Sequence, residues 1–128
     1  MSIALSTSLK TNFDDAVART REALAEQGFG VLTEIDVKST LKAKLDANME
    51  NYLILGACNP PLAHRAIGVD RQIGLLLPCN VVVRQDAAGA VQVEFLDPGM
   101  MGQMTDNSDV APVGAEVREK LQKVMRAL

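Results

Sequence analysis

The chain has 128 residues, of which 48% are hydrophobic, 23% are charged and 3% are aromatic, and its formal net charge is −3. These values are typical of one globular domain over residues 1–128, long enough to bury a core without a metal or a disulfide. They argue against a disordered chain, and the lack of a basic stripe or stacking aromatics argues against a nucleic-acid partner.

The first third of the chain predicts a strand followed by a helix. Residues 2–8 alternate apolar and polar side chains, as a half-buried strand does. Asn12 is a typical helix cap, and Gly28 is a typical residue after a helix end. The apolar stripe of this helix is formed by Phe13, Val17, Thr20 and Leu24. We expect this stripe to face the core.

The middle of the chain predicts two more strands with a short helix between them. Residues 29–37 alternate apolar and polar side chains and predict a strand. Asp36 or Ser39 can cap a short helix that carries Leu41 and Leu45, before a polar break. Residues 52–58 are almost wholly apolar, which favours a central strand that is buried on both faces.

The last part predicts two helices and a hairpin. Asn59 followed by two prolines is a helix-start signal. Residues 81–85 and 91–96 read as two strands joined by a short loop, which is a β-hairpin. Residues 100–110 are irregular, and Pro112 opens a final amphipathic helix. The expected order is β-α-β-α-β-α-β-β-α, an α+β fold with a mixed sheet of about five strands and helices packed on it.

Two similar clusters are the most unusual feature of the sequence. Cys58-Asn59-Pro60-Pro61 and Pro78-Cys79-Asn80 each place a thiol beside an amide and a proline at a strand end. Such a thiol can act as a nucleophile, a redox centre or a soft-metal ligand, and strand ends present side chains to ligands. The alternative is that both cysteines are inert core residues and that Asn59 is only a helix cap.

From this pattern we predict a set of site residues. The ligand-binding set is Cys58, Asn59, Pro60, Cys79, Asn80 and Asp97. Cys58 and Cys79 are weak candidates for a catalytic role. Asp97 is included because it ends a strand, directly before Pro98 and Gly99.

Other residues are weaker candidates for a functional site. His64, the only histidine, is expected on the solvated side of its helix. Two cysteines and one histidine are too few for a structural zinc, so we assign no metal ligands and identify no cofactor. The methionines of residues 100–104 can bind Cu(I), or they can form a flexible hydrophobic plug or an oligomer contact. We favour the plug.

Three segments in order carry a resemblance to a known family. They read GFGVLTEIDV over residues 28–37, GACNPPLA over 56–63 and GLLLPCNVVV over 74–83, and Asp97-Pro98 follows with its methionine-bearing segment. The sequence resembles the prokaryotic family catalogued as domain of unknown function 302. The resemblance implies a compact α+β domain that is often dimeric, and it implies no activity.

The leading functional hypothesis is a binding domain with a small-molecule or soft-metal site near the two clusters. The alternatives are a thiol enzyme or redox carrier using Cys58 or Cys79, and a structural interaction module. We expect a homodimer, because a small aliphatic monomer would struggle to cover its Met-rich segment. Without a signal peptide or a membrane-spanning run, a cytoplasmic protein with no membrane partner is expected.

The arrangement of the two thiols depends on strand direction. Cys58 ends the third predicted strand and Cys79 stands at the start of the fourth. If these strands are antiparallel neighbours, both thiols lie at the same end of the sheet. We predict the antiparallel case, because it gives the duplicated clusters one shared site.

Overall fold

Five strands form one sheet in the computed structural model of the protein, which describes residues 3–128. The strands are β1 (Ala4–Leu9), β2 (Gly30–Asp36), β3 (Tyr52–Cys58), β4 (Cys79–Gln85) and β5 (Val91–Leu96). Their order across the sheet is β1-β5-β4-β3-β2. The α+β class and the predicted order of elements are confirmed. Ser2, where the first strand was predicted to begin, lies outside the described residues.

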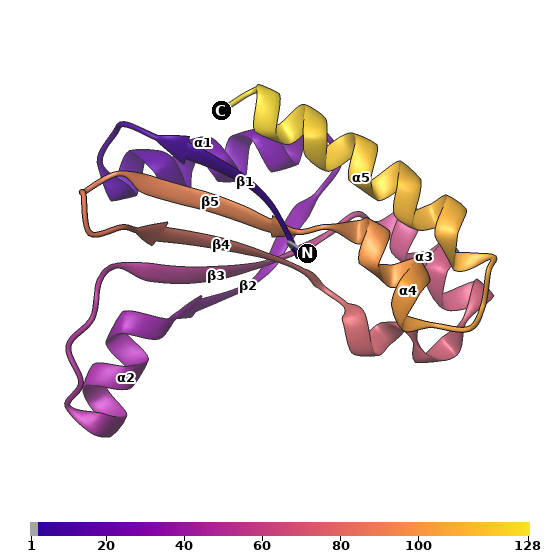
Figure 1. Cartoon of the computed structure of the whole chain (residues 1–128), viewed down its shortest axis with the longest axis horizontal. Helices are drawn as coiled ribbons and strands as arrows, with labels where there is room; N and C mark the ends of the chain where they lie inside the picture. Colours follow the sequence, from indigo (N-terminus) through magenta and orange to yellow (C-terminus); the bar gives the residue numbers. More distant parts are fainter. Residues whose placement is uncertain (1–2) are drawn as a thin grey trace.

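The sheet is antiparallel throughout, so the prediction of a mixed sheet was wrong in that detail. All four pairs of neighbouring strands run antiparallel. A parallel pair needs a connection that crosses back over the sheet. The connections between neighbours here do not cross back: a loop joins β4 to β5, and the helices that follow β2 and β3 extend beyond the ends of those strands (Figure 1).

Five α-helices and two 3-10 turns complete the described chain. They are α1 (Phe13–Glu26), α2 (Val37–Leu45), α3 (Pro60–Val69), η1 (Arg71–Leu76), η2 (Pro98–Met100), α4 (Met101–Met104) and α5 (Val110–Arg126). Figure 1 shows α1 and α5 together along one side of the sheet, and α2 alone at the far end from α3 and α4. Within residues 3–128, no helix combines the length and apolar character needed to cross a membrane.

The main core lies between one face of the sheet and the helices α1 and α5. Side chains alternate along each strand, and the apolar ones of the inner strands point to this face. Its fully buried strand residues include Leu55, Val81, Val83, Val91, Val93 and Phe95. A smaller second cluster joins α3, η1, α4 and the start of α5 through Ala66, Ile73, Met101, Val110 and Val113.

Helix α1 forms as predicted but turns a slightly different side to the core. The Asn12 side chain accepts a hydrogen bond from the Asp15 backbone, and Gly28 has a positive φ of 82° just after the helix. The buried residues are Ala16, Thr20, Ala23 and Leu24. Phe13 and Val17 are half-buried because the contact line with the sheet runs through the small alanines.

Two other expectations needed correction. Strand β3 is an inner strand, paired with β4 on one side and β2 on the other, but it is not buried on both faces, because its burial alternates over its first residues. The apolar run of residues 52–58 therefore predicted more burial than β3 has. Within residues 100–110, which were predicted to be irregular, Met101–Met104 form the single-turn helix α4, and α5 begins at Val110, two residues before the predicted start at Pro112.

Gly56 allows the sheet to close tightly beside the two cysteines. A Cβ atom at Gly56 would overlap the Thr33 hydroxyl and would lie 2.8 Å from Cγ of Pro78. Thr33 reaches this position after a β-bulge between Val31 and Thr33, which shifts the register of β2 against β3. The absence of a side chain at Gly56 therefore fixes how closely β2 and Pro78 approach β3.

Replacing Leu24 by Ala should destabilise the protein strongly. Leu24 is fully buried between α1 and the sheet, and such truncations cost about 2–5 kcal/mol of unfolding free energy. Urea unfolding measures the loss. Leu32→Ala is the matched control, since Leu32 is 68% exposed and should change stability by less than about 0.5 kcal/mol. Equal losses in both variants would contradict this core assignment.

Gly56→Ala should also destabilise, through overpacking rather than through a cavity. Inserting a methyl group between Thr33 and Pro78 forces one of them to move, which typically costs about 1–3 kcal/mol. Gly30→Ala is the control, because a Cβ atom there has no neighbour within 4 Å. Thermal melting of the two variants should separate them, and a Gly56→Ala protein as stable as Gly30→Ala would disprove the close approach.

Candidate functional site

The two cysteines lie at the same end of the sheet. Strands β3 and β4 are antiparallel, and Ala57 lies directly opposite Cys79. The predicted antiparallel arrangement is confirmed. With strands about 5 Å apart and a rise of about 3.4 Å per residue, the Cα atoms of Cys58 and Cys79 are roughly 6 Å apart. Both cysteines are free thiols.

A small cavity lies where these strand ends meet the helices. Cys58, Asn59 and Cys79 all line it. In a regular strand Cys58 would point away from the face that carries Cys79, but β3 ends at Cys58 and the chain turns at Asn59 into α3. The cavity volume is about 20 Å³, which is room for one water molecule or one ion.

The remaining wall of this cavity is apolar, and it includes one methionine. It is formed by Phe29, Ala57, Leu62, Ala63, Ala66, Leu77, Met101, Val113 and Val117. These residues come from both hydrophobic clusters, so the cavity lies at the junction of the two. Met101 brings a thioether to the same space as the two thiols.

Asn59 holds the strand end, the helix start and the end of α1 together. Its amide is buried, with 8% of the residue exposed. The side-chain oxygen accepts a hydrogen bond from the Leu62 backbone, 3.4 Å away, and the amide nitrogen donates to the Gln27 carbonyl, 3.3 Å away. Because both ends of the amide are engaged, Asn59 positions the site rather than offering a free donor to a ligand.

Burial keeps the Cys79 thiol protonated. Desolvation and, as the smaller cause, the nearby charge of Cys58 together raise the pKa of Cys79 to about 11. An activated cysteine nucleophile needs the opposite, a lowered pKa. The interaction between the two sulfur groups also agrees with their sharing one cavity.

The other predicted site residues lie outside this cavity. Pro60 is exposed at the start of α3. Asn80 is exposed on the opposite face of the sheet, where it lines a shallow surface hollow with Val82. Asp97 caps η2 through the Gly99 backbone and forms an ion pair with Arg118 of α5, 3.0 Å away. The structure thus brings together Cys58, Asn59 and Cys79, and not the remaining three.

Met101 belongs to the methionine segment of residues 100–104, for which Cu(I) binding was one possibility and a hydrophobic plug was favoured. It is 5% exposed, and it reaches the cavity because α4 packs closely on α5. Gly114 of α5 permits the close approach of η2, which leads directly into α4. A Cβ atom at Gly114 would lie 2.8 Å from the Pro98 carbonyl oxygen. The cluster of methionines was a signal, but only the packing separates buried Met101 from exposed Met104.

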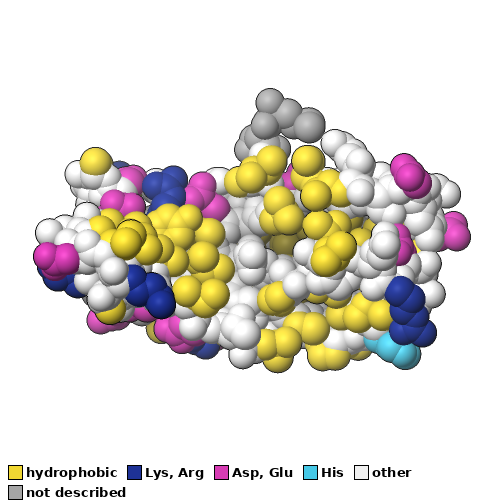
Figure 2. Space-filling view, turned by 90° about the horizontal axis from the view of Figure 1, so that it is seen from below, with side chains coloured by type: hydrophobic (Ala, Val, Ile, Leu, Met, Phe, Trp, Pro, Cys, Tyr) yellow, Lys and Arg dark blue, Asp and Glu magenta, His cyan; other side chains and the backbone are white. Residues whose placement is uncertain are grey.

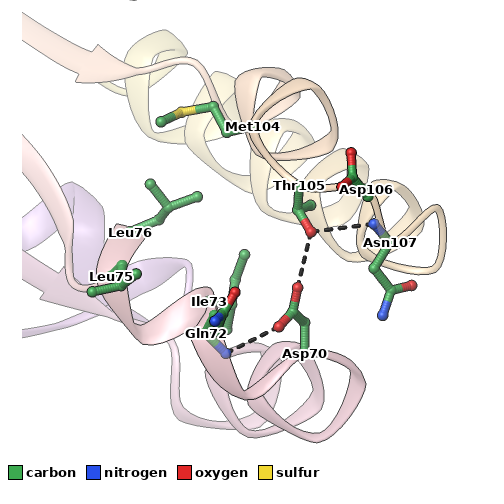
Figure 3. Close-up of a pocket in the computed structure, with 9 residues that line it drawn as sticks. All are labelled: Asp70, Gln72, Ile73, Leu75, Leu76, Met104, Thr105, Asp106 and Asn107. Carbon is green, nitrogen blue, oxygen red and sulfur yellow. Dashed lines mark hydrogen bonds between the residues drawn. The ribbon is translucent and has the colours of Figure 1, made fainter.

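A second and larger hollow was not predicted. It is a groove of about 520 Å³ between η1 and the segment that joins α4 to α5 (Figure 3). Leu75, Leu76 and Met104 lie toward one end of it in this view, and the polar residues lie toward the other. The groove shares no residue with the thiol cavity.

Hydrogen bonds hold the polar end of the groove together. Asp70 accepts hydrogen bonds from the Thr105 hydroxyl and from the Gln72 backbone, at 2.9 Å and 3.0 Å. Asn107 donates to the Val69 carbonyl. These bonds fix the loop that follows α4 against the end of α3, so the groove is a formed surface. Asp106 lines the same end and is exposed.

Comparison with known proteins gives one family. The family described as "Domain of unknown function DUF302" matches residues 5–128. A crystal structure described as an uncharacterized conserved DUF302 protein from Bacillus stearothermophilus is similar over 99% of this chain and 98% of its own, with 25% sequence identity and a TM-score of 0.92. No curated protein matches the sequence.

The raised pKa of Cys79 predicts slow, pH-dependent alkylation. In a Cys58→Ser variant, where burial still raises the pKa of Cys79, the rate of reaction with iodoacetamide should keep rising about tenfold per pH unit beyond the ordinary thiol value, because only the thiolate reacts. The same protein unfolded in urea should level off near the ordinary thiol value of 9.0. A folded rate that levels off at or below that pH would contradict the burial argument.

Proposed function

We propose that this chain, which belongs to the DUF302 family, binds one soft metal ion through the sulfur atoms of Cys58, Cys79 and Met101. The observation that carries the proposal is the cavity of about 20 Å³ that all three residues line. A space of this size suits a single ion and is far below the ~300 Å³ or more that drug-sized organic ligands occupy.

The donor set indicates which ion to expect. Two thiolates and a thioether are soft ligands, and soft ligands select Cu(I). Within residues 3–128, no group of three or more His, Cys, Asp or Glu side chains is placed to hold a metal ion. The ligands on offer are therefore sulfur atoms, which favours a monovalent soft ion over the oxygen-bound or nitrogen-bound divalent ions.

Binding of the ion is coupled to the loss of the thiol protons. A thiol becomes a metal ligand as its thiolate, so Cys58 and Cys79 each release a proton on binding, whereas the Met101 thioether releases none. Since burial raises the pKa of Cys79, this release is costly at neutral pH and the affinity should increase as the pH rises toward 11. Asn59 would act as a positioning residue, since its two hydrogen bonds hold the strand end beside the helix.

The alternative of a thiol enzyme is less well supported. The protonated state of Cys79 at neutral pH disfavours it as a nucleophile, and the small cavity leaves no room for an organic substrate next to it. The proposal also includes a reducing, cytoplasmic setting, which keeps both thiols free, and a homodimeric state. The other alternative, a structural interaction module, would use a part of the surface outside the thiol cavity.

Titration with Cu(I) in competition with a chelator of known affinity tests the proposal. The protein should bind one ion per chain, and Cys79→Ser and Met101→Leu should each weaken binding by about tenfold or more, which is ~1.4 kcal/mol. The affinity of the unchanged protein should fall as the pH is lowered.

Met104→Leu is the matched control, because Met104 is 61% exposed and does not line the thiol cavity. It should bind Cu(I) as the unchanged protein does. Circular dichroism checks that each variant is folded. Absence of stoichiometric binding, or equal binding by folded Cys79→Ser and the unchanged protein, would overturn the proposed site.

A further inference from the structure

Helix α2 is an amphipathic helix whose apolar stripe is only partly covered: Val37 and Leu41 are half-buried beside β2 and β3, and Leu45 is exposed. It contains no buried residue, although Val37, Leu41 and Leu45 form a stripe at i, i+4 and i+8. Leu45 is 71% exposed. A nine-residue helix is marginal in water by itself, because most helix stability comes from packing an apolar face. In Figure 1, α2 extends from the sheet with no other helix beside it.

The groove beside η1 has the complementary character. Leu75 is 86% exposed and Met104 is 61% exposed, and both line the groove with Leu76. These are large apolar side chains that a monomer leaves in water. The groove is preformed, since the hydrogen bonds of Asp70 and Asn107 fix its polar end.

Charge also matches between the two surfaces. Helix α2 carries Lys38, Lys42 and Lys44 between its caps Asp36 and Asp46, and Lys42 forms an ion pair with Asp46, which leaves Lys38 and Lys44 for a partner. The groove is lined by two carboxylates, Asp70 and Asp106, and among the described residues no Lys or Arg belongs to its lining. A helix that carries free lysines beside an apolar stripe therefore fits an acidic groove with an apolar end.

Both surfaces are visible on one side of the molecule. Figure 2 shows hydrophobic side chains gathered in two areas, at the left over the α2 end and at the right over the end that carries η1 and α4. A two-fold axis that passes between the two areas brings the α2 of each copy onto the groove of the other. Such a contact uses the same surface on both copies and closes after two of them.

We propose that the occupant of the groove is helix α2 of a second copy of this chain, docked reciprocally. This inference rests on the homodimer of the proposed function and names its interface, and it is independent of the metal site. Each dimer then contains two identical junctions, in which the Leu41–Leu45 side of one copy lies on Leu75, Leu76 and Met104 of the other. The lysines of α2 lie near Asp70 and Asp106.

Sedimentation equilibrium tests the interface with two charged substitutions at exposed positions. Leu45→Asp damages α2 and Leu75→Asp damages the groove, and neither side chain belongs to the core. The unchanged protein should be a dimer at about 10 µM, and each variant should dissociate at least about tenfold more readily, or ~1.4 kcal/mol. Leu32→Asp is the control, because Leu32 is 68% exposed but lies in neither surface, and it should remain dimeric.

Mixing the two damaged variants tests the reciprocal geometry. In a mixed dimer, the intact α2 of Leu75→Asp meets the intact groove of Leu45→Asp, so one junction is restored. The mixture should therefore contain dimers at a concentration where each variant alone is monomeric. An interface formed by α2 against α2 predicts no such recovery, and its absence would overturn the proposed junction.

The remaining outcomes are also decisive. A monomeric unchanged protein would overturn both the homodimer and this interface, and it would leave the groove to a different partner. A dimer that survives both substitutions would overturn the interface alone.

Cys79→Ser should still dimerise, so a failed metal titration leaves this inference standing. Dissociation should increase with added salt, because opposite charges meet across each junction; dissociation unchanged by salt would contradict that charge match.

Discussion

The arrangement of this molecule depends on a sheet that is covered on one face only. Antiparallel strands alternate their side chains, and the inner strands send valine, leucine and phenylalanine to the face beneath α1 and α5. The opposite face carries a mixture of polar and apolar groups, including the ion pair between Arg84 and Glu94. One covered face supplies the core, and the other stays partly exposed.

The thiol cavity lies at the end of the covered side of the sheet, where the two hydrophobic clusters meet. The main core is held by strands and two long helices, whereas the second cluster is held by shorter elements that surround the start of α5. Packing between two such clusters is rarely perfect, and a small space remains where they meet. Asn59 ties three elements together at that point, and Gly114 lets Pro98 and Met101 approach α5.

The same environment defines what the cysteines can do. Burial stabilises a neutral thiol over a thiolate, so it suppresses nucleophilic chemistry at Cys79. A bound cation reverses that preference, because it neutralises the charge that burial disfavours. A desolvated Cys79 beside Cys58 and a thioether is therefore better suited to holding a soft ion than to attacking a substrate. The role that we propose for the groove at η1 is association.

The sequence by itself determined the local elements and their order. The caps at Asn12 and Asn59, the glycine at position 28 and the loop between β4 and β5 act over a few residues, so their effects can be read directly from the chain. The convergence of Cys58 and Cys79 could also be predicted, because it needed only the direction of one strand pair. What the tertiary structure alone decided is which side chains share a space. Met101 joined the thiols, Asn80 was turned to the opposite face, and α2 was left only partly covered, because each of these outcomes depends on how neighbouring segments pack.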